Sequence, residues 1–349
     1  MYVPIMKNRT VEVSVLQQLS SMHVFDQNVI PLIELIQDKT RSNNRNTFIQ
    51  DLEKYLSDAP QMRIMVDFFK STKLRNTTDA IREYVTLALR QPDFCIGELA
   101  KLQRFNDRVI PVISYLSDSI SLERITYEAS SLRKHFPQIA FRIKVQEFDS
   151  VFTHIESLIS PNDFLILDID SASHMSPVFK KIYKRISDSK RNKKFTSIVI
   201  NAHRPESLSN KDMADGEPIA DIDNSLKELY SSSYMHRFDG FGDYAGIAAS
   251  LPSTGGAISP VGIYYSVENN FFVAYRGRAP QLSEFPEYIA PRIVDSEYWK
   301  EFEDEHHCAC PGCKEIQDIF NGDKSGRNQA QWKMITMLHY IYTMYETKA

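Results

Sequence analysis

Short apolar runs recur along the chain from Tyr2 to Tyr244. Each run is rich in β-branched or aromatic residues and is apolar on both faces, which is typical of strands in a parallel sheet. The eight runs are Tyr2–Met6, Val29–Ile33, Arg63–Phe68, Val109–Ile113, Ala140–Val145, Phe164–Ile169, Thr196–Ile200 and Phe238–Tyr244. We therefore predict eight strands that are buried on both sides.

Polar stretches with helical periodicity separate most of these runs. In Thr47–Leu56 the apolar residues recur at helical spacing, and Thr47 stands where it can cap the first turn. Similar patterns predict helices at Ser14–Leu19, Thr78–Val85, Leu122–Phe136, Val151–Ile159, Pro177–Ser187 and Ile222–Tyr230. Eight units of roughly 30 residues, within about 250 residues, predict a (β/α)8 barrel of the TIM type, an α/β fold. The main alternative is an open doubly wound sheet, but the Gly-rich turn expected after its first strand does not follow Met6.

The pattern changes after residue 250. Two apolar runs, Val261–Ser266 and Asn270–Tyr275, flank a short turn and predict an antiparallel hairpin. Helices are predicted at Phe285–Ile293, Ser296–Asp304 and Gln329–Tyr345. We therefore divide the chain into a barrel at 1–250 and a second part at 251–349, which holds the C-terminal hairpin, a Cys- and His-rich helical lobe and a closing helix.

Composition limits the class of protein. The 349 residues are 42% hydrophobic, and 41 Lys and Arg nearly balance 45 Asp and Glu. This excludes a disordered tail and argues against a protein built mainly to coat nucleic acid. No apolar stretch reaches the roughly 18 residues of a transmembrane helix, and the N-terminus shows no secretory signal. Because the cysteines are too clustered for a disulfide framework, we expect a soluble protein of the reducing cytoplasm with no membrane partner.

Two basic stretches, Lys180–Arg185 and Lys190–Lys194, flank or lie on the helix before the seventh predicted strand. The simpler interpretation is a solvated helix face. The alternative is a patch that binds nucleic-acid phosphates or an acidic partner.

Polar residues lie at the ends of several predicted strands, at the edge where barrel enzymes place their active sites. They are Lys7, Glu34, Asp67, Lys144, Asp168, Asp170, Asn201 and Asp243. Converging carboxylates could bind a divalent metal or act as general acid and base, and Lys7 and Lys144 could hold a phosphate. The alternative is a structural network in which lysines neutralise buried carboxylates. No Gly-x-Ser-x-Gly elbow and no Walker loop point to another chemistry.

Four further residues are candidates for binding an anion. His203 and Arg204 follow the seventh predicted strand, where barrels often bind phosphate. Arg276 and Arg278 flank a glycine at the end of the hairpin and could grip a phosphate or a carboxylate. The alternative for this second pair is a solvated turn with a salt bridge.

A dense group of metal-ligand residues lies near the C-terminus. Three thiols and two imidazoles fall within eight residues, at His306, His307, Cys308, Cys310 and Cys313. This set can supply the three sulfurs and one nitrogen of a tetrahedral zinc site, and such a site would pin a loop-rich lobe. The alternatives are free surface thiols and a redox or catalytic role.

Four segments, in this order and spacing, resemble the phage Beta protein family, which is known from satellite phages and bacterial defence loci. They are Tyr2–Ile5, Val29–Glu34, Phe241–Tyr244 and Tyr275–Gly277. The resemblance runs almost from end to end. The chain departs from the commoner family pattern near its end, where a single His339 stands in place of a His-His pair.

The resemblance implies a cytoplasmic component of an antiphage, toxin–antitoxin-like cassette carried by a prophage or related element. In the best-known arrangement the Beta protein restrains a killer protein called Gop. We therefore expect this chain to restrain a Gop-like partner by binding it. The alternative is a barrel enzyme that acts on a phosphorylated or nucleotide substrate through the strand-end carboxylates. Nucleic acid is a lesser candidate partner.

Overall fold

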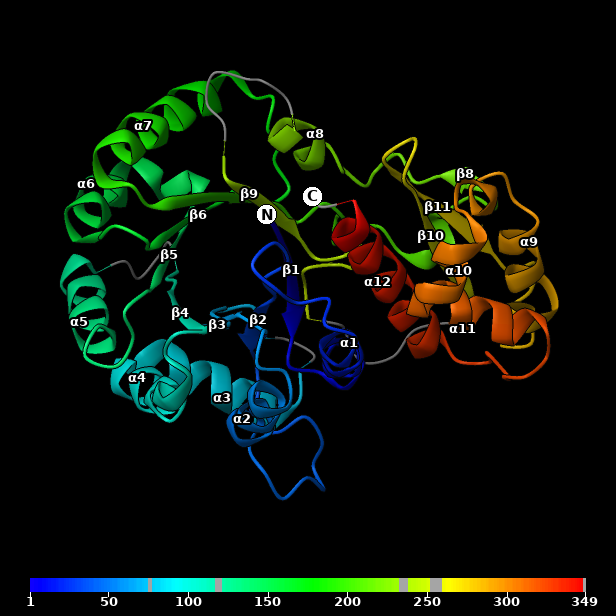
Figure 1. The fold of residues 1–349 in the computed structure, drawn as a ribbon, viewed down its shortest axis with the longest axis horizontal. Coiled ribbons are helices and arrows are strands. Elements are labelled where there is room, and N and C mark those ends of the chain that lie inside the picture. The colour runs from blue at the N-terminus through cyan, green and yellow to red at the C-terminus, as the bar shows by residue number, and fades with distance from the viewer. Residues whose placement is uncertain (75–76, 117–120, 232–237, 252–258, 348–349) are drawn as a thin grey trace.

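The structure, a computed structural model, describes residues 1–74, 77–116, 121–231, 238–251 and 259–347. Eight parallel strands close into a barrel in which β1 pairs with both β2 and β9 (Figure 1). The strands are β1 (Tyr2–Lys7), β2 (Leu32–Leu35), β3 (Ile64–Phe68), β4 (Val109–Ile113), β5 (Ala140–Lys144), β6 (Phe164–Asp168), β7 (Thr196–Ile200) and β9 (Gly240–Asp243). The predicted (β/α)8 barrel is therefore confirmed, and each predicted run overlaps one of its strands.

Helices surround the barrel between its strands (Figure 1). They are α1 (Thr10–Ser21), α2 (Phe48–Asp58), α3 (Asp79–Arg90), α4 (Pro92–Ala100), α5 (Leu122–Leu132), α6 (Phe148–Leu158), α7 (Pro177–Lys193) and α8 (Leu226–Ser231), with short 3-10 turns at η1 (Gln103–Phe105), η3 (Val145–Glu147) and η4 (Asn210–Asp212). Thr47 caps α2 as predicted. Its side chain accepts from the backbone N–H of Gln50, and the Gln50 side chain accepts from the backbone N–H of Thr47. Helix α4, which carries Cys95, was not predicted; it begins at Pro92, where the ring favours a first helical turn.

The register of the parallel strands places charged residues at one level of the barrel. Lys7 of β1 lies opposite Glu34 of β2, and Glu34 lies opposite Asp67 of β3. Lys144 of β5 lies opposite Asp168 of β6. All of these residues lie at the carboxyl ends of their strands, so their side chains gather at the same mouth of the barrel.

The lobe lies beside the barrel (Figure 1). Its sheet is the predicted hairpin of β10 (Val261–Ser266) and β11 (Phe271–Arg276), joined by the short strand β8 (Glu217–Pro218). The π-helical turn η5 (Phe285–Ile289), α9 (Ala290–Val294), the 3-10 turn η6 (Trp299–Glu301), α10 (Asp304–Ala309), α11 (Pro311–Phe320) and α12 (Gln329–Glu346) follow. The helix predicted at Ser296–Asp304 is confined to the η6 turn. The segment with three cysteines is helical rather than rich in loops, since it spans α10 and α11.

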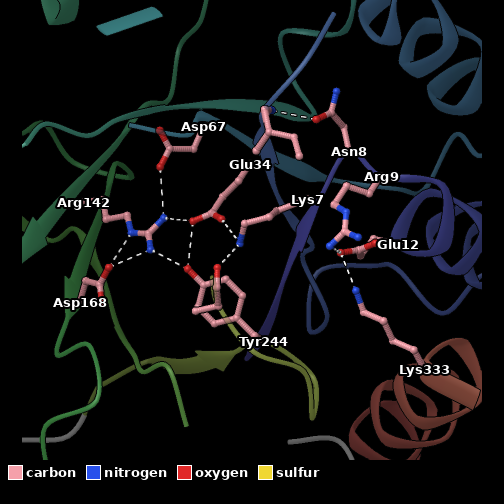
Figure 2. Close-up of polar contacts among 12 residues, drawn as sticks. Lys7, Asn8, Arg9, Glu12, Glu34, Asp67, Arg142, Asp168, Tyr244 and Lys333 are labelled. Atoms are coloured by element: carbon pink, nitrogen blue, oxygen red, sulfur yellow. Dashed lines mark hydrogen bonds and ion pairs between the residues drawn. The ribbon is translucent and has the colours of Figure 1, made fainter. Parts of the chain in front are cut away.

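Helix α12 lies between the other elements of the lobe and the barrel (Figure 1). It packs on α1 and β1 on one side and on β10 and α11 on the other. Lys333 of α12 reaches the buried Glu12 of α1 at 3.0 Å (Figure 2). The closing helix of the sequence prediction therefore covers the barrel, and β8 from before residue 250 completes the sheet of the lobe, so the two parts share elements.

No helix in the described part of the chain combines the length and the apolar character that crossing a bilayer requires.

Candidate functional site

Arg142 of β5 is the centre of a charged network at the barrel mouth (Figure 2). Its Nε and Nη2 donate to Oδ2 of Asp168 at 3.0 and 2.7 Å. Its Nη1 donates to Oε1 of Glu34 at 2.8 Å and, at a longer 3.3 Å, to Oδ2 of Asp67. Burial alone would lower the pKa of Arg142, but Asp168 and the other acidic groups raise it well above its usual value, so the guanidinium stays charged.

Lys7 and Tyr244 complete the network from β1 and the end of β9. The ammonium of Lys7 lies 2.9 Å from Oε2 of Glu34 and 4.7 Å from the centre of the Tyr244 ring. The Tyr244 hydroxyl donates to Oε1 of Glu34 at 3.0 Å and accepts from Nη2 of Arg142 at 3.2 Å. Both oxygens of Glu34 therefore face cations or donors, and the buried carboxylate is well compensated.

The two neighbouring carboxyl groups Glu34 and Asp67 differ in their pKa values. Burial raises the pKa of Glu34, but Lys7 and Arg142 outweigh it and lower the value to about 2. Burial also raises the pKa of Asp67, and there the more distant Arg142 and the hydroxyl of Ser114, which donates at 2.6 Å, do not overcome it. Glu34 is thus the fixed anion, and Asp67, whose pKa is raised, is the carboxyl group of the pair that takes up a proton more readily.

A cavity of about 290 Å³ opens above this network. Outside the network of Arg142, its charged lining is uneven. Lys70, Lys73 and Lys144 lie on the side of β3 and β5, whereas Asp170 and Glu206 follow β6 and β7. A pocket of this kind at the carboxyl end of a barrel is the default place for a ligand.

The structure brings most of the predicted strand-end residues to this cavity. Lys7, Glu34, Asp67 and Asp168 join one network, as the sequence predicted. Lys144 and Asp170 line the cavity without contacting Arg142; Asp170 has left the strand in a left-handed turn, φ 53°, and its N–H donates to Asp168.

Arg142 is not among the predicted site residues, although it lies inside a predicted strand. It precedes Lys144 by two residues and so faces the same side of the sheet. A charged residue in the middle of a buried strand was the available signal. Because of its position, the carboxylates converge on a cation of the chain itself.

Asp243 belongs to a different network on the outer side of β9. Its Oδ1 accepts from the Tyr2 hydroxyl at 2.8 Å, and its Oδ2 accepts from the Tyr340 hydroxyl of α12 at 2.8 Å. The backbone N–H of Gly246 donates to Nε2 of His203, so Nδ1 carries the proton and points at Asp243 from 3.5 Å. Asp243 and His203 therefore link the barrel to α12 and do not line the mouth cavity.

The predicted arginine candidates make local contacts. Arg204 is mostly buried and donates to the carbonyl of Leu208 and to Asn210. Arg276 donates to the carbonyl of Lys211. Arg278 pairs with Glu284 on the surface of the lobe, as the alternative of a solvated salt bridge predicted. Predicted Asn201 donates to the carbonyl of Asp223.

The basic stretch on α7 exposes Lys180, Lys181 and Lys184. Other cations of this helix are already paired, for example Arg185 with Asp149 at 2.6 Å. The stretch is a charged helix face with ion pairs along it.

Four side chains of the lobe lie close enough to hold one metal ion. One ligand atom from each of His306, Cys310, Cys313 and His339 lies within 4.8 Å of all the others, and all four residues are buried. Among the described residues, this is the group whose geometry could hold a metal ion. It contains three of the predicted ligands, His306, Cys310 and Cys313, together with His339 from α12.

Two of the predicted metal ligands lie outside this group, which corrects the predicted set. His307 stacks on Trp299 with the ring centres 4.0 Å apart. Cys308 is exposed to solvent. Both lie on α10, where residues one or two positions from His306 point in other directions around the helix.

Comparison with known proteins adds one finding. The sequence profile of a family described as Beta protein matches residues 2–346, nearly the whole chain. No curated protein matches the chain.

Proposed function

This chain belongs to the Beta protein family, and from its barrel mouth we propose that it binds a small phosphorylated or nucleotide ligand and acts on it by acid–base chemistry. The observation that carries the proposal is the uneven charge of the mouth cavity. The lysines on the side of β3 and β5 suit a phosphate, and the carboxylates beyond β6 and β7 suit the hydroxyl or amino groups of a nucleoside.

The cavity lysines differ in how free they are to take a ligand. Lys70 donates to the carbonyl of Ser114 at 2.5 Å. Within the described residues, the ammonium groups of Lys73 and Lys144 have no hydrogen-bond or ion-pair partner. A phosphate would supply that partner without displacing any contact of the chain.

Asp67 is the group that we assign to proton transfer. It faces the cavity, its pKa is raised by burial, and the neighbouring Glu34 stays ionised. Two carboxyl groups with pKa values pushed apart are the usual pair for acid–base work. Glu34 and Arg142 would then position Asp67 and hold the charge of the site constant.

Calorimetric titration with nucleoside mono-, di- and triphosphates and with inorganic phosphate tests the proposal. Removing both free lysines in a Lys73→Ala/Lys144→Ala variant should weaken binding about tenfold or more. Lys181→Ala, which removes an exposed lysine of α7, is the matched control. Asp67→Asn should keep binding and lose turnover of the bound ligand, followed by chromatography. A wild-type chain that binds none of these ligands, or a double variant that binds like wild type, contradicts the proposal.

Family membership favours a second function, the restraint of a Gop-like killer protein within an antiphage cassette. The two functions can be tested separately, because all the residues that line the mouth cavity belong to the barrel part of the chain. Co-expression with the neighbouring killer gene should give copurification of the two proteins and restored growth. If neither occurs, the chain does not restrain this partner. If both occur equally with Asp67→Asn, restraint does not depend on the mouth.

The two predicted metal sites lie in different parts of the chain. At the mouth, Lys7 and Arg142 already neutralise the carboxylates, so the proposed chemistry needs no divalent metal there. We place the metal in the lobe and propose that it is a structural zinc ion. The four cysteines are unpaired, which supports a reducing cytoplasm as the place where the protein works.

A further inference from the structure

We infer that His306, Cys310, Cys313 and His339 form one tetrahedral zinc site that clamps the lobe onto α12 and thereby fixes α12 against the barrel. The inference rests on the proposal that the metal of the lobe is zinc. It adds the ligand set, the atoms that bind and the mechanical role of the ion.

The distances between the ligand atoms suit a single zinc ion. Zn–S bonds of about 2.3 Å and Zn–N bonds of about 2.0–2.1 Å in a tetrahedron place sulfur and nitrogen about 3.6 Å apart. Nδ1 of His339 lies 3.7 Å from Sγ of Cys310 and 3.4 Å from Sγ of Cys313. His339 and the two thiols therefore already stand at the spacing that the ion would impose.

The other nitrogen of each histidine is held by an acceptor, which fixes the tautomer. Nδ1 of His306 lies 2.5 Å from a carboxylate oxygen of Glu346, and Nε2 of His339 lies 3.1 Å from the carbonyl oxygen of Tyr265. Each of these nitrogens carries the proton, so Nε2 of His306 and Nδ1 of His339 present lone pairs. Nε2 of His306 is buried and has no hydrogen-bond partner in the described part of the chain. This outer shell is the arrangement that orients zinc-bound histidines.

Aromatic stacking fixes the planes of both imidazoles. The His339 ring stacks on Tyr264 with centres 4.1 Å apart, and the His306 ring stacks on Phe302 at 4.1 Å. The rings are thus held in place before a metal binds, as in a prepared site.

Gly312, between the two cysteines, is needed for the approach of α11 to α12. A Cβ at this position would lie 2.6 Å from the backbone nitrogen of His339 and 2.8 Å from the carbonyl oxygen of Ile335. Only glycine leaves room for the two helices to meet there. The Cys310-Pro-Gly-Cys313 turn therefore starts α11 and at the same time brings both thiols to His339.

The compactness of the group separates zinc from an iron–sulfur cluster. Two Cys and two His also bind Rieske clusters, but there the cysteines bind one iron and the histidines the other. Here His339 lies against both cysteines, which fits one shared ion. Mixed sulfur and nitrogen donors in a tetrahedron are the preference of zinc.

The clamp reaches the barrel through the residue that follows His339. The hydroxyl of Tyr340 donates to Asp243 of β9 at 2.8 Å and lies 3.1 Å from Oδ1 of Asn224. One turn of α12 thus carries a metal ligand on the side of the lobe and an anchor on the side of the barrel. The ion would thus join α10, α11 and α12, of which α11 already packs against the other two.

Metal analysis of the full-length protein, purified without added metal, tests the ligand set. We expect about one zinc per chain in the wild type and loss of most of it in Cys310→Ser and His339→Gln. The controls Cys308→Ser and His307→Gln should keep the wild-type content. A wild type without zinc overturns the proposed cofactor. Zinc that survives His339→Gln but is lost with Cys308→Ser overturns only the ligand set inferred here.

Hydrogen exchange before and after zinc removal by a chelator tests the clamp. The backbone amides of α11 and α12 should lose protection at least about tenfold, a change of roughly 1.4 kcal/mol in opening free energy. Amides of α5, on the far side of the barrel, are the internal reference and should change less. Unchanged protection of α12 after proven zinc loss means that the ion binds but does not clamp.

Discussion

Replacing Glu34 by glutamine tests whether the barrel mouth is held by charge. Glutamine keeps the size of the side chain and removes the anion that Lys7 and Arg142 contact at 2.9 and 2.8 Å. The pKa of Glu34 lies at about 2 against an ordinary 4.5, although burial opposes this. That difference means that folding favours the ionised form by about 3 kcal/mol. We expect Glu34→Gln to lower the free energy of unfolding by about this amount at pH 7.

The same shift fixes the sign of the pH dependence. A carboxyl group with a lowered pKa stabilises the fold above its unfolded value, and this contribution is lost as the pH falls from 4.5 towards 2. The difference between wild type and Glu34→Gln should therefore shrink over that window, because the wild type itself becomes protonated. The raised pKa of Asp67 acts in the opposite direction, and Glu34→Gln removes one of its causes, because the charge of Glu34 helps to raise it.

Urea denaturation followed by far-ultraviolet circular dichroism, from pH 7 down to pH 3, measures the effect. Both tryptophans, Trp299 and Trp332, lie after residue 250. Tryptophan fluorescence therefore reports on η6 and α12, whereas circular dichroism reports on the whole chain. Asp149→Asn is the control, since its pair with Arg185 is exposed and such pairs contribute about 0–1 kcal/mol. A loss below about 1 kcal/mol at pH 7, or a difference that does not change with pH, would refute the ionic account of the mouth.

Three further outcomes are expected. Gly312→Ala should destabilise the lobe by about 1–3 kcal/mol in urea denaturation and lower the content of the proposed zinc, because the added methyl group meets α12. Its control is Gly97→Ala in α4, where no atom lies within 4 Å of the new methyl group, and this variant should stabilise the protein by about 0.5–1 kcal/mol. Tyr340→Phe should lower the free energy of unfolding by about 1–3 kcal/mol, since it leaves a buried carboxylate short of a donor. A thiol reagent should label Cys308 at once in the native protein and leave Cys95 unlabelled, because Cys95 is buried and burial raises its pKa to about 12; rapid labelling of Cys95 would contradict the structure.

The barrel could be predicted because its signals are local and repeated. A buried parallel strand needs apolar residues on both faces, and that requirement leaves a continuous apolar run in the sequence. Helix α4 was not predicted, although Pro92 at its first position is a sequence signal for the start of a helix. The helix predicted at Ser296–Asp304 is wrong in the other direction, because a helix was predicted where the chain forms only a 3-10 turn at Trp299–Glu301. The next α-helix, α10, begins at Asp304.

The candidate site was predictable where strand ends decide the geometry. Lys7, Glu34, Asp67 and Asp168 end or nearly end parallel strands, so they had to gather at one mouth. Arg142 was not predicted because the candidates were taken from the ends of the strands, and Arg142 lies two residues before the end of β5. Long side chains reach the mouth from deeper in the barrel, which end positions alone do not reveal.

The metal ligands show a different limit. Spacing within the sequence found His306, Cys310 and Cys313, because neighbouring residues on short helices must lie close in space. It also included His307 and Cys308, since sequence distance does not say which face of a helix a side chain takes. His339 comes from another helix, and its contact with the cysteines depends on the tertiary approach of α11 and α12 that Gly312 permits.

Two consecutive residues at the end of β9, Asp243 and Tyr244, connect helix α12 to the mouth of the barrel. Successive side chains of a strand face opposite sides of the sheet. Tyr244 points into the mouth and bonds Glu34 and Arg142, whereas Asp243 points outward and bonds Tyr340 of α12. A displacement of α12 would therefore pull on Asp243 at the end of β9, and the next residue, Tyr244, lines the cavity. The structure thus links α12 to the mouth through one hydrogen bond, from Tyr340 to Asp243, and the peptide bond from Asp243 to Tyr244. Loss of the proposed zinc from the lobe is the perturbation that would reveal whether this link transmits a change.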